Sequence, residues 1–188
     1  YRAMAVYFSK NKVNPEDESA INEAVKNVDI KIEYQNGEQQ VILNGENVTG
    51  LLRTEETGNM ASKTSKYKEV RSKLVELQRE LAKTTDVVMD GRDIGTTVLP
   101  DAFVKIYLIA SSDARAKRRY DELVAKGEQC DLSAIKEDIE KRDYQDMHRE
   151  ISPLKQAEDA VLLDTSDMNI EQVVAAMRDI IDNAVKNK

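Results

Sequence analysis

The sequence lacks several features that would place a protein in particular classes. It contains a single cysteine, Cys130, which excludes an internal disulfide and a cysteine-rich zinc site. Its longest apolar run, residues 106–110, is far shorter than the ~20 residues that a membrane-spanning helix needs. No secretory signal is recognisable in it. We therefore expect a cytoplasmic protein with a reduced thiol at Cys130 and no membrane partner.

An excess of basic residues is also missing. The 188 residues include 28 lysines and arginines against 35 aspartates and glutamates, and the formal net charge is −7. General nucleic-acid-binding proteins carry a basic face, so this balance predicts no nucleic-acid partner. A small anionic substrate remains compatible with it, because the local placement of arginines decides such binding. The only histidine, His148, stands apart from any cluster of potential metal ligands, so we expect a surface residue and no metal-binding residues.

Two helices are predicted at the start of the chain. The spacing of the apolar residues predicts the first helix over residues 1–11. Asn14 has the side chain of a helix cap and Pro15 suits the first helical position, so we expect the second helix to begin there. The total length suits one domain, or one domain with a large insert.

A strand pattern follows these helices. Apolar residues alternate over residues 30–34, and the dipeptide Asn36-Gly37 that comes next is the strongest short signal for a hairpin. A second turn is predicted at Asn44-Gly45, with a third short strand from Val48. Residues 13–52 are therefore expected to form a small α+β insert with an antiparallel meander.

Three short apolar runs predict a different kind of sheet in the rest of the chain. They comprise residues 86–90, 104–110 and 160–164, and only Lys105 interrupts the second run. Near-continuous apolar strands separated by helices are typical of parallel sheets that are covered on both faces. An amphipathic helix is predicted over residues 67–82, before the first run. The predicted fold class is therefore α/β.

The helices beside these runs carry terminal signals. Ser111 or Ser112 is expected to cap the helix after the second run, and Gly127 is expected to end it. Asn169 is expected to cap the last helix, with Gln172 completing a capping box.

Charged residues come directly after the first predicted strand, in the segment Asp90-Gly91-Arg92-Asp93-Ile94-Gly95. Ligands of open parallel sheets bind beyond the carboxyl ends of the strands. The glycines would let the backbone approach a ligand, and the Arg92 guanidinium presents a fork that matches phosphate. A tight turn that carries surface charges is the alternative interpretation.

Two predicted helices add further candidates. One face of the helix over residues 132–149 changes from apolar to charged, and its residues are Ile135, Ile139, Arg142, Asp146 and Arg149. This face suits the wall of a pocket, but a solvated helix with an ion pair gives the same pattern. Arg115, Arg118 and Arg119 gather early in the preceding helix, where they either clamp phosphoryl groups or simply face solvent.

The segment from Val88 to Ala102 resembles the signature segment of the bacterial cytidylate kinases. Other motifs that resemble that family occur in order along nearly the whole chain: Arg53-Thr54-Glu55-Glu56 with Ala61-Ser62, Val70-Arg71 with Leu77-Gln78-Arg79, Arg142-Asp143 with Asp146 and Arg149, and Ser152-Pro153-Leu154-Lys155 with Ala157-Glu158-Asp159-Ala160. The resemblance implies a P-loop kinase-type parallel sheet flanked by helices. It also implies a small α+β monophosphate-binding insert and a short helical lid.

The resemblance further implies a domain organisation and a reaction. A core kinase domain is expected from residues 1–12 and 53–188, with the insert at residues 13–52 and the lid helices at residues 112–149. The expected reaction transfers the γ-phosphoryl group of ATP to CMP or dCMP, with Mg²⁺ as the metal cofactor. The expected partners are these nucleotides alone, and the protein is expected to be a monomer.

Individual roles also follow from the resemblance. It assigns the CMP phosphate to Arg2 and Arg92, the pentose to Ser62, Arg142 and Asp146, the base to Arg71, Asp93 and Arg149, and the ATP phosphates to the lid residues Arg115 and Arg119. Arg92, Asp93 and Arg149 are the residues expected to be catalytic. An aspartate can accept from the amino group of cytosine while an arginine donates to N3 and O2. Uracil reverses the pattern at C4 and N3, so Asp93 would face an acceptor oxygen.

One departure from the family pattern is large. The family begins with a strand and a Gly-rich phosphate loop, but no G-x-x-x-x-G-K-[ST] segment occurs in this sequence. Tyr1-Arg2 matches the residues just after the family's second strand. We therefore expect the native protein to carry a preceding segment that contains this loop, and residues 1–188 alone to fold poorly and to be inactive.

Two alternatives stay open at this point. The first is a kinase that acts on another monophosphate, such as UMP or AMP, and activities measured side by side would separate it. The second is a non-catalytic nucleotide-binding module that has lost its phosphate loop. The coding sequence upstream of Tyr1 would distinguish that module from an active kinase.

Overall fold

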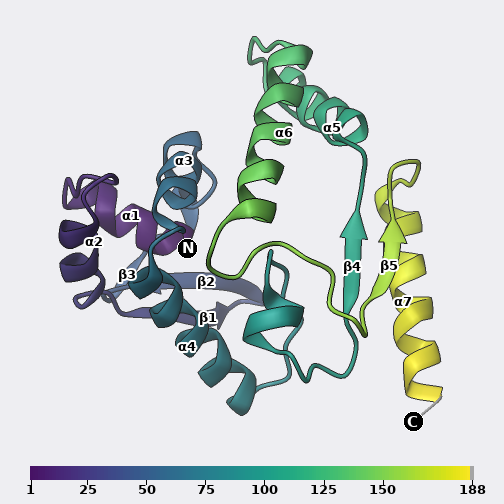
Figure 1. The fold of residues 1–188 in the computed structure, drawn as a ribbon, viewed down its shortest axis with the longest axis horizontal. Helices are drawn as coiled ribbons and strands as arrows, with labels where there is room; N and C mark the ends of the chain where they lie inside the picture. The colour runs from purple at the N-terminus through teal and green to yellow at the C-terminus, as the bar shows by residue number, and fades with distance from the viewer. Residues whose placement is uncertain (187–188) are drawn as a thin grey trace. The chain divides into compact units, whose positions relative to one another are not determined.

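The computed structural model describes residues 1–186 and divides the chain into two units, Tyr1–Val88 and Met89–Lys188. In Figure 1 the first unit runs from purple to blue-green, and the second continues through green to yellow. An antiparallel sheet belongs to the first unit and a parallel pair of strands to the second. The predicted combination of an antiparallel meander with parallel strands is therefore confirmed.

The first unit combines helices with a small sheet. Its elements are α1 (Arg2–Lys10), α2 (Glu18–Val25), β1 (Ile30–Gln35), β2 (Glu38–Leu43), β3 (Glu46–Asn47), a 3-10 turn (Thr49–Leu51), α3 (Glu55–Thr64) and α4 (Lys68–Thr84). The helices predicted over residues 1–11 and 67–82 are confirmed, with small shifts at their ends.

The core of this unit is built around α1. Met4 and Phe8 are four residues apart on one face of this helix, and both are fully buried. Ile21 of α2, Val48 and Val70 of α4 are further fully buried members of the same cluster. Burying each of these large apolar side chains stabilises the fold by ~1.5–3 kcal/mol relative to exposure.

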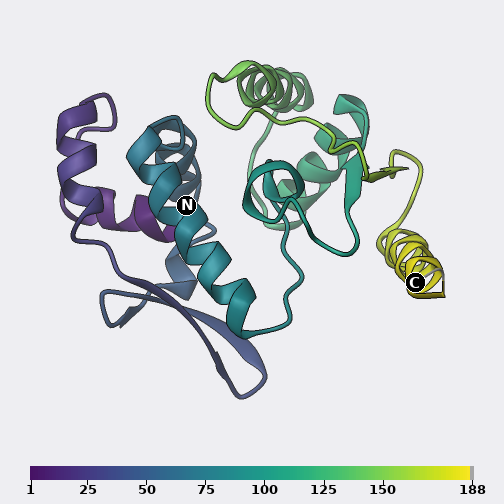
Figure 2. The same cartoon turned by 60° about the horizontal axis from the view of Figure 1, so that its bottom comes forward.

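The two faces of the antiparallel sheet have different roles. The register pairs Ile30 with Leu43 and Ile32 with Val41, and this face contributes to the core. Figure 2 shows the helices of this unit gathered on one side of the β1–β2 hairpin. The opposite face, which includes Lys31, is polar and uncovered.

Two details of the predicted insert are wrong. α2 begins at Glu18 rather than at Pro15, because Asp17 is the cap and accepts from the Ala20 amide at 3.0 Å. Asn14 instead accepts from the Glu16 amide two residues on, at 3.1 Å, which is a turn that Asn favours.

The third strand also differs from its prediction. β3 precedes Val48 instead of beginning there, because the short turn at residues 44–45 pairs Glu46 directly with Leu43. Val48 itself is fully buried in the core.

The second unit contains the parallel strands. Its elements are a π-helical turn (Ile94–Val98), β4 (Ile106–Ile109), α5 (Ser112–Ala125), α6 (Leu132–His148), β5 (Val161–Asp164) and α7 (Ile170–Lys186). β4 pairs with β5 in a parallel register from Ile106–Val161 to Ile109–Asp164, as Figure 1 shows. Helices connect the two strands and follow the second, so the α/β class is confirmed.

The first predicted parallel strand, residues 86–90, is not formed. This segment has no regular structure in the described part of the chain, and Val88 is 98% exposed. An apolar run becomes a strand only when another strand supplies partners for its N–H and C=O groups. Neither of the two described sheets includes these residues. The sheet was also predicted to be covered on both faces. This coverage is incomplete, since Leu108 of β4 and Leu162 of β5 are 49% and 52% exposed.

Local side-chain chemistry fixes the helix ends as predicted. Ser111 caps α5 by accepting from the Ala114 amide at 3.1 Å. Asn169 and Gln172 exchange two hydrogen bonds of 2.9 Å before and within the first turn of α7, which confirms the capping box. These caps orient the helices that follow both parallel strands.

Gly127 ends α5 with a φ of +77°, and no atom lies within 4 Å of the position of an added Cβ. The Gly127 and Glu128 amides donate to the Val124 and Leu123 carbonyls at 2.9 and 3.0 Å.

We expect Gly127→Ala to reduce the free energy of unfolding by ~1 kcal/mol, because a residue with a Cβ is strained at this φ. Denaturant unfolding measures the change. Gly50→Ala is the control, since Gly50 has equally open surroundings and no positive φ; equal effects would contradict the prediction.

Candidate functional site

Asp146 joins two arginines in the second unit. Its Oδ2 accepts from Arg92 Nε at 2.9 Å, and its Oδ1 accepts from Arg149 Nη1 at 3.1 Å. The Asp146 side chain is 24% exposed, whereas those of Arg149 and Arg92 are 13% and 61% exposed. The charged segment at residues 90–95 and the end of α6, predicted from separate signals, therefore meet at one carboxylate.

Arg149 is also held by the backbone that follows α6. Its Nε donates to the Ser152 carbonyl at 2.7 Å, and the Leu154 amide donates back to the Asp146 carbonyl at 2.8 Å. Hydrogen bonds from a guanidinium are stronger than those between neutral groups. The Arg149 head group is consequently fixed in place by both a carboxylate and a loop.

Asp93, which follows Arg92 in the sequence, is buried, with 6% of its surface exposed. It precedes the π-helical turn, and its carbonyl accepts from the Thr97 and Val98 amides at 2.9 and 3.2 Å. Turns of this type are rare and are frequent at functional sites. The charged segment with two carboxylates and an arginine is present, but the strand predicted before it is absent.

The predicted face of α6 is present but not uniform. Ile135, Ile139, Asp146 and Arg149 are partly buried along it. The Arg142 side chain is 49% exposed and donates to Asp138 at 2.9 Å. Arg142 therefore uses a different carboxylate from the one that Arg92 and Arg149 share.

Arg115 has a partner that was given no role in the sequence analysis. Its Nη1 and Nη2 donate to the two oxygens of Asp143 at 2.9 and 2.6 Å, and its Nε donates to the Ala110 carbonyl at 3.0 Å. This bidentate pair ties α5 to α6, which lie side by side in Figure 1. The neighbouring Arg119 instead donates to Glu122 at 2.9 Å on the surface of α5.

Every arginine with a predicted role in this unit has a carboxylate partner. The pairs are Arg92–Asp146, Arg115–Asp143, Arg119–Glu122, Arg142–Asp138 and Arg149–Asp146. Hydrogen bonds from Lys126 and then Arg119 lower the pKa of the Glu122 carboxyl. A hydrogen bond from Lys105 likewise lowers the pKa of the Asp159 carboxyl. The Glu122 and Asp159 carboxylates are therefore charged at neutral pH and balance the positive groups beside them.

The remaining predicted residues lie in the first unit. Arg2 is exposed at the start of α1, and its Nη1 donates to the Leu52 carbonyl at 2.7 Å. An added Cβ at Gly58 of α3 would lie 3.4 Å from Arg2 Nη1 and 3.5 Å from Nη2. The missing side chain at Gly58 therefore gives the Arg2 guanidinium room beside α3.

Arg71 and Ser62 differ in burial. Arg71 of α4 is 3% exposed, and its Nη1 donates to the Tyr1 hydroxyl at 3.0 Å. Its guanidinium carbon also lies 5.6 Å from the centre of the Tyr1 ring, which is a cation–π contact. Ser62 is exposed on α3.

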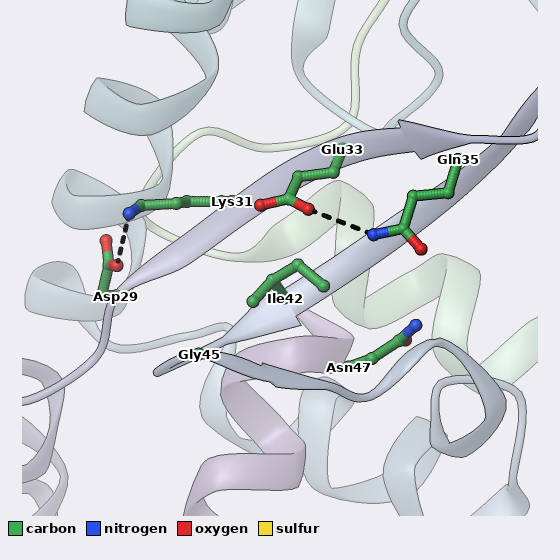
Figure 3. A pocket seen from close by; sticks show the side chains of 7 residues that line it. All are labelled: Asp29, Lys31, Glu33, Gln35, Ile42, Gly45 and Asn47. Atoms are coloured by element: carbon green, nitrogen blue, oxygen red, sulfur yellow. Dashed lines mark hydrogen bonds and ion pairs between the residues drawn. The ribbon is translucent and has the colours of Figure 1, made fainter.

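A hollow of about 400 Å³ lies on the polar face of the antiparallel sheet, and Figure 3 shows its side chains. Its lining consists of Asp29, Lys31, Glu33, Gln35, Ile42, Gly45 and Asn47. Lys31 approaches Asp29 to 3.7 Å and Gln35 donates to Glu33 at 3.5 Å, so these groups contact one another. None of the predicted site residues belongs to this lining, and we assign it no ligand.

Arg118, which the sequence groups with Arg115 and Arg119 as a phosphate clamp or a solvent-facing residue, contacts backbone carbonyls near β5. Its Nη2 donates to the Thr165 carbonyl and, at 3.1 Å, to the Met168 carbonyl. These bonds connect α5 to the loop after β5. The sequence shows that these arginines cluster. Only the contacts with the Thr165 and Met168 carbonyls show that Arg118 has different partners from Arg115 and Arg119.

Residues 1–186 contain neither a cluster of metal ligands nor a membrane-spanning helix. In this part of the chain, no three His, Cys, Asp or Glu side chains are grouped so that they could hold a metal ion. Its helices also include none with the length and apolar character required to cross a bilayer.

A parallel strand pair flanked by helices is consistent with a P-loop kinase fold. Comparison with known proteins identifies the group within that class. A family model described as cytidylate kinase matches residues 1–183. The chain belongs to the cytidylate kinase family.

Curated relatives agree with this assignment. The cytidylate kinase of Lactobacillus gasseri is 51% identical over 187 residues, which cover 100% of this chain and 81% of the relative. That of Leuconostoc mesenteroides is 48% identical, covering 98% of this chain and 83% of the relative. That of Caldicellulosiruptor bescii is 45% identical, covering 100% and 83%.

Proposed function

We propose that the protein transfers the γ-phosphoryl group of ATP to CMP or dCMP, giving CDP or dCDP. The match of residues 1–183 to the cytidylate kinase family carries this proposal. The shared carboxylate of Arg92 and Arg149 supports it, because phosphoryl transfer is catalysed mainly by the positioning of reactants and by positive charge.

Arg92 and Arg2 are proposed to bind the phosphate of the acceptor nucleotide. Arg92 contacts Asp146 through Nε, the inner nitrogen of its guanidinium, and its side chain is 61% exposed. A guanidinium anchored in this way can direct its outer nitrogens towards a phosphate. Arg2 is exposed as well, and the Leu52 carbonyl orients its head group.

Asp93, Arg71 and Arg149 are proposed to read the base. Asp93 and Arg71 are 6% and 3% exposed, and a hydrogen bond made away from water discriminates strongly between bases. The Asp93 carboxylate would accept from the cytosine amino group, while the arginines would donate to N3 and O2. With Asp93 and Arg92, Arg149 completes the set proposed as catalytic.

Ser62, Arg142 and Asp146 are proposed to bind the pentose. Asp146 offers acceptor oxygens to a sugar hydroxyl and is already oriented by Arg92 and Arg149. Ser62 and Arg142 are both exposed, which leaves them accessible to a substrate.

The donor is proposed to bind as the complex of ATP with Mg²⁺. Mg²⁺ in such sites is held largely by substrate phosphates and water, so a chain without a carboxylate cage is compatible with it. Arg115 and Arg119 of α5 would clamp ATP phosphates, in exchange for their bonds to Asp143 and Glu122. Closure of the lid over the substrates would keep water from the transferred group.

The domain organisation and setting are also part of the proposal. Residues 1–12 and 53–188 would form the core kinase domain, residues 13–52 the monophosphate-binding insert, and residues 112–149 the lid. α5 and α6, which the Arg115–Asp143 pair connects, fall within the last range. The protein is proposed to act as a cytoplasmic monomer.

The proposal predicts a defined order of substrates. With ATP and Mg²⁺, the full translated protein that contains residues 1–188 is expected to phosphorylate CMP and dCMP with a higher kcat/KM than UMP or AMP. Coupled assays with the four acceptors measure this directly. A higher kcat/KM with UMP or AMP would replace the proposed substrate, and absence of turnover with all four would favour the non-catalytic alternative.

The same assay includes a second arm. Residues 1–188 expressed alone are expected to be inactive, because they contain no G-x-x-x-x-G-K-[ST] segment to hold the donor phosphates. CMP phosphorylation by this shorter protein at the rate of the full protein would show that such a loop is dispensable.

Replacement of Asp93 tests the reading of the base. We expect Asp93→Ala to reduce kcat/KM for CMP by roughly one to two decades, since a lost hydrogen bond to a charged group costs ~1.5–3 kcal/mol. The KM for ATP is expected to change little. Steady-state kinetics of the full protein measure both values, with Asp179→Ala on the exposed surface of α7 as the control. Unchanged efficiency with CMP would overturn the role of Asp93.

Replacement of Asp146 tests the recognition of the sugar. If its carboxylate accepts from a hydroxyl that dCMP lacks, Asp146→Ala will lower kcat/KM more for CMP than for dCMP. The two substrates are compared in one assay, and Glu137→Ala, an exposed position on the same helix, is the control. Equal losses for CMP and dCMP would argue that Asp146 only positions its two arginines.

A further inference from the structure

Lys105 is a buried charge for which the proposed reaction has no direct use. It precedes β4 within an otherwise apolar run, and its side chain is only 8% exposed. Lys117 and Lys136, which form ion pairs elsewhere in the same unit, are 63% and 38% exposed. Lysine is almost never buried to this extent unless its ammonium group has partners.

Three hydrogen bonds satisfy the Lys105 ammonium group. Nζ donates to Asp159 Oδ1 at 2.8 Å and Oδ2 at 2.7 Å, and also to the Pro100 carbonyl. An ammonium group has three protons to donate, so these acceptors match its full capacity. Asp159 lies just before β5, whereas Pro100 follows the π-helical turn. One side chain therefore connects the start of β5 to the end of the segment that follows Asp93.

The Lys105 stem also lies close to Gly95 in the same segment. A Cβ added to Gly95 would lie 3.3 Å from Lys105 Cδ and 3.6 Å from Cγ. Gly95 lies within the π-helical turn whose amides at Thr97 and Val98 bind the Asp93 carbonyl. The Lys105 side chain thus lies close to the turn near its start, at Gly95, and donates a hydrogen bond beyond its end, at Pro100.

The other end of this connection is rigid. The Lys105 carbonyl accepts from the Val161 amide at 2.9 Å, directly before the ladder of β4 and β5. The lysine backbone is therefore fixed by the parallel strand pair while its side chain reaches the turn. A loop that presents a binding group is positioned most accurately when a strand supports it.

We propose that Lys105 is a positioning residue, which holds the turn after Asp93 against the strand pair so that Asp93 can distinguish cytosine from uracil. The inference rests on the proposed function, in which Asp93 reads the base. Lys105 itself does not touch the substrate. Its role is to limit the movement of residues 94–100.

Lys105→Met in the full protein tests this role. Methionine keeps an unbranched stem beside Gly95 but removes all three hydrogen bonds, and Asp159 is 64% exposed, so its carboxylate stays hydrated. The ratio of kcat/KM for CMP to that for UMP is expected to fall roughly tenfold, mostly through KM for CMP. The KM for ATP is expected to change less than about twofold. Lys83→Met, which breaks a surface ion pair on α4 outside the proposed lid, is the matched control and is expected to leave all values unchanged.

A second variant decides the question if Lys105→Met does not fold. Gly95→Ala keeps every charge but adds a Cβ that would lie 3.3 Å from Lys105 Cδ, so the lysine stem or the turn must shift slightly. It is expected to lower the CMP-to-UMP ratio as well, while the KM for ATP stays constant. An unchanged ratio in the folded variants overturns the proposal, as does an equal loss of CMP and ATP binding, which would indicate general structural damage.

The Asp93→Ala variant separates this inference from the function on which it rests. If Asp93→Ala lowers the CMP-to-UMP ratio and Lys105→Met does not, only the positioning role fails. If neither the unmodified protein nor any variant prefers CMP, the proposed function fails first.

Discussion

Two guanidinium groups of like charge converge at the end of α6, and the Asp146 carboxylate between them makes that arrangement stable. Arg92 and Arg149 approach one oxygen each, at 2.9 and 3.1 Å. Because Arg92 belongs to the segment before the π-helical turn, the same carboxylate also ties that segment to α6. Removing it would leave two partly desolvated cations near each other, which is more costly than losing an exposed ion pair. Asp93 directly follows Arg92 in that segment, so the same connection also helps to place Asp93.

Features encoded by neighbouring residues could be predicted from the sequence. The capping box of Asn169 and Gln172, the cap at Ser111 and the hairpin at Asn36-Gly37 each involve groups within three residues. Their chemistry has few alternatives, so the pattern determines the structure. The prediction of Asn14 as the cap of the second helix was wrong, because Asp17 caps α2 and Asn14 forms a turn instead.

Features that depend on distant residues could not be predicted in the same way. The run at residues 86–90 has the composition of a strand, but pairing requires a neighbour that composition cannot supply. Lys105 was visible as an interruption of an apolar run, yet its partner Asp159 lies 54 residues away. The family motif contained Asp143, and only the fold shows that it binds Arg115. Arg2, Ser62 and Arg71 retain roles that come from the resemblance.

If Arg115 and Arg119 bind phosphate as proposed, the carboxylates paired with them compete with that phosphate. A phosphate that reaches Arg115 or Arg119 exchanges one anionic partner for another, so the gain is only the difference between two ion pairs. Free inorganic phosphate would therefore be held weakly, and the sugar and base must supply the rest of the affinity. The same exchange would help the product to leave, because the Asp143 or Glu122 carboxylate would pair with its arginine again.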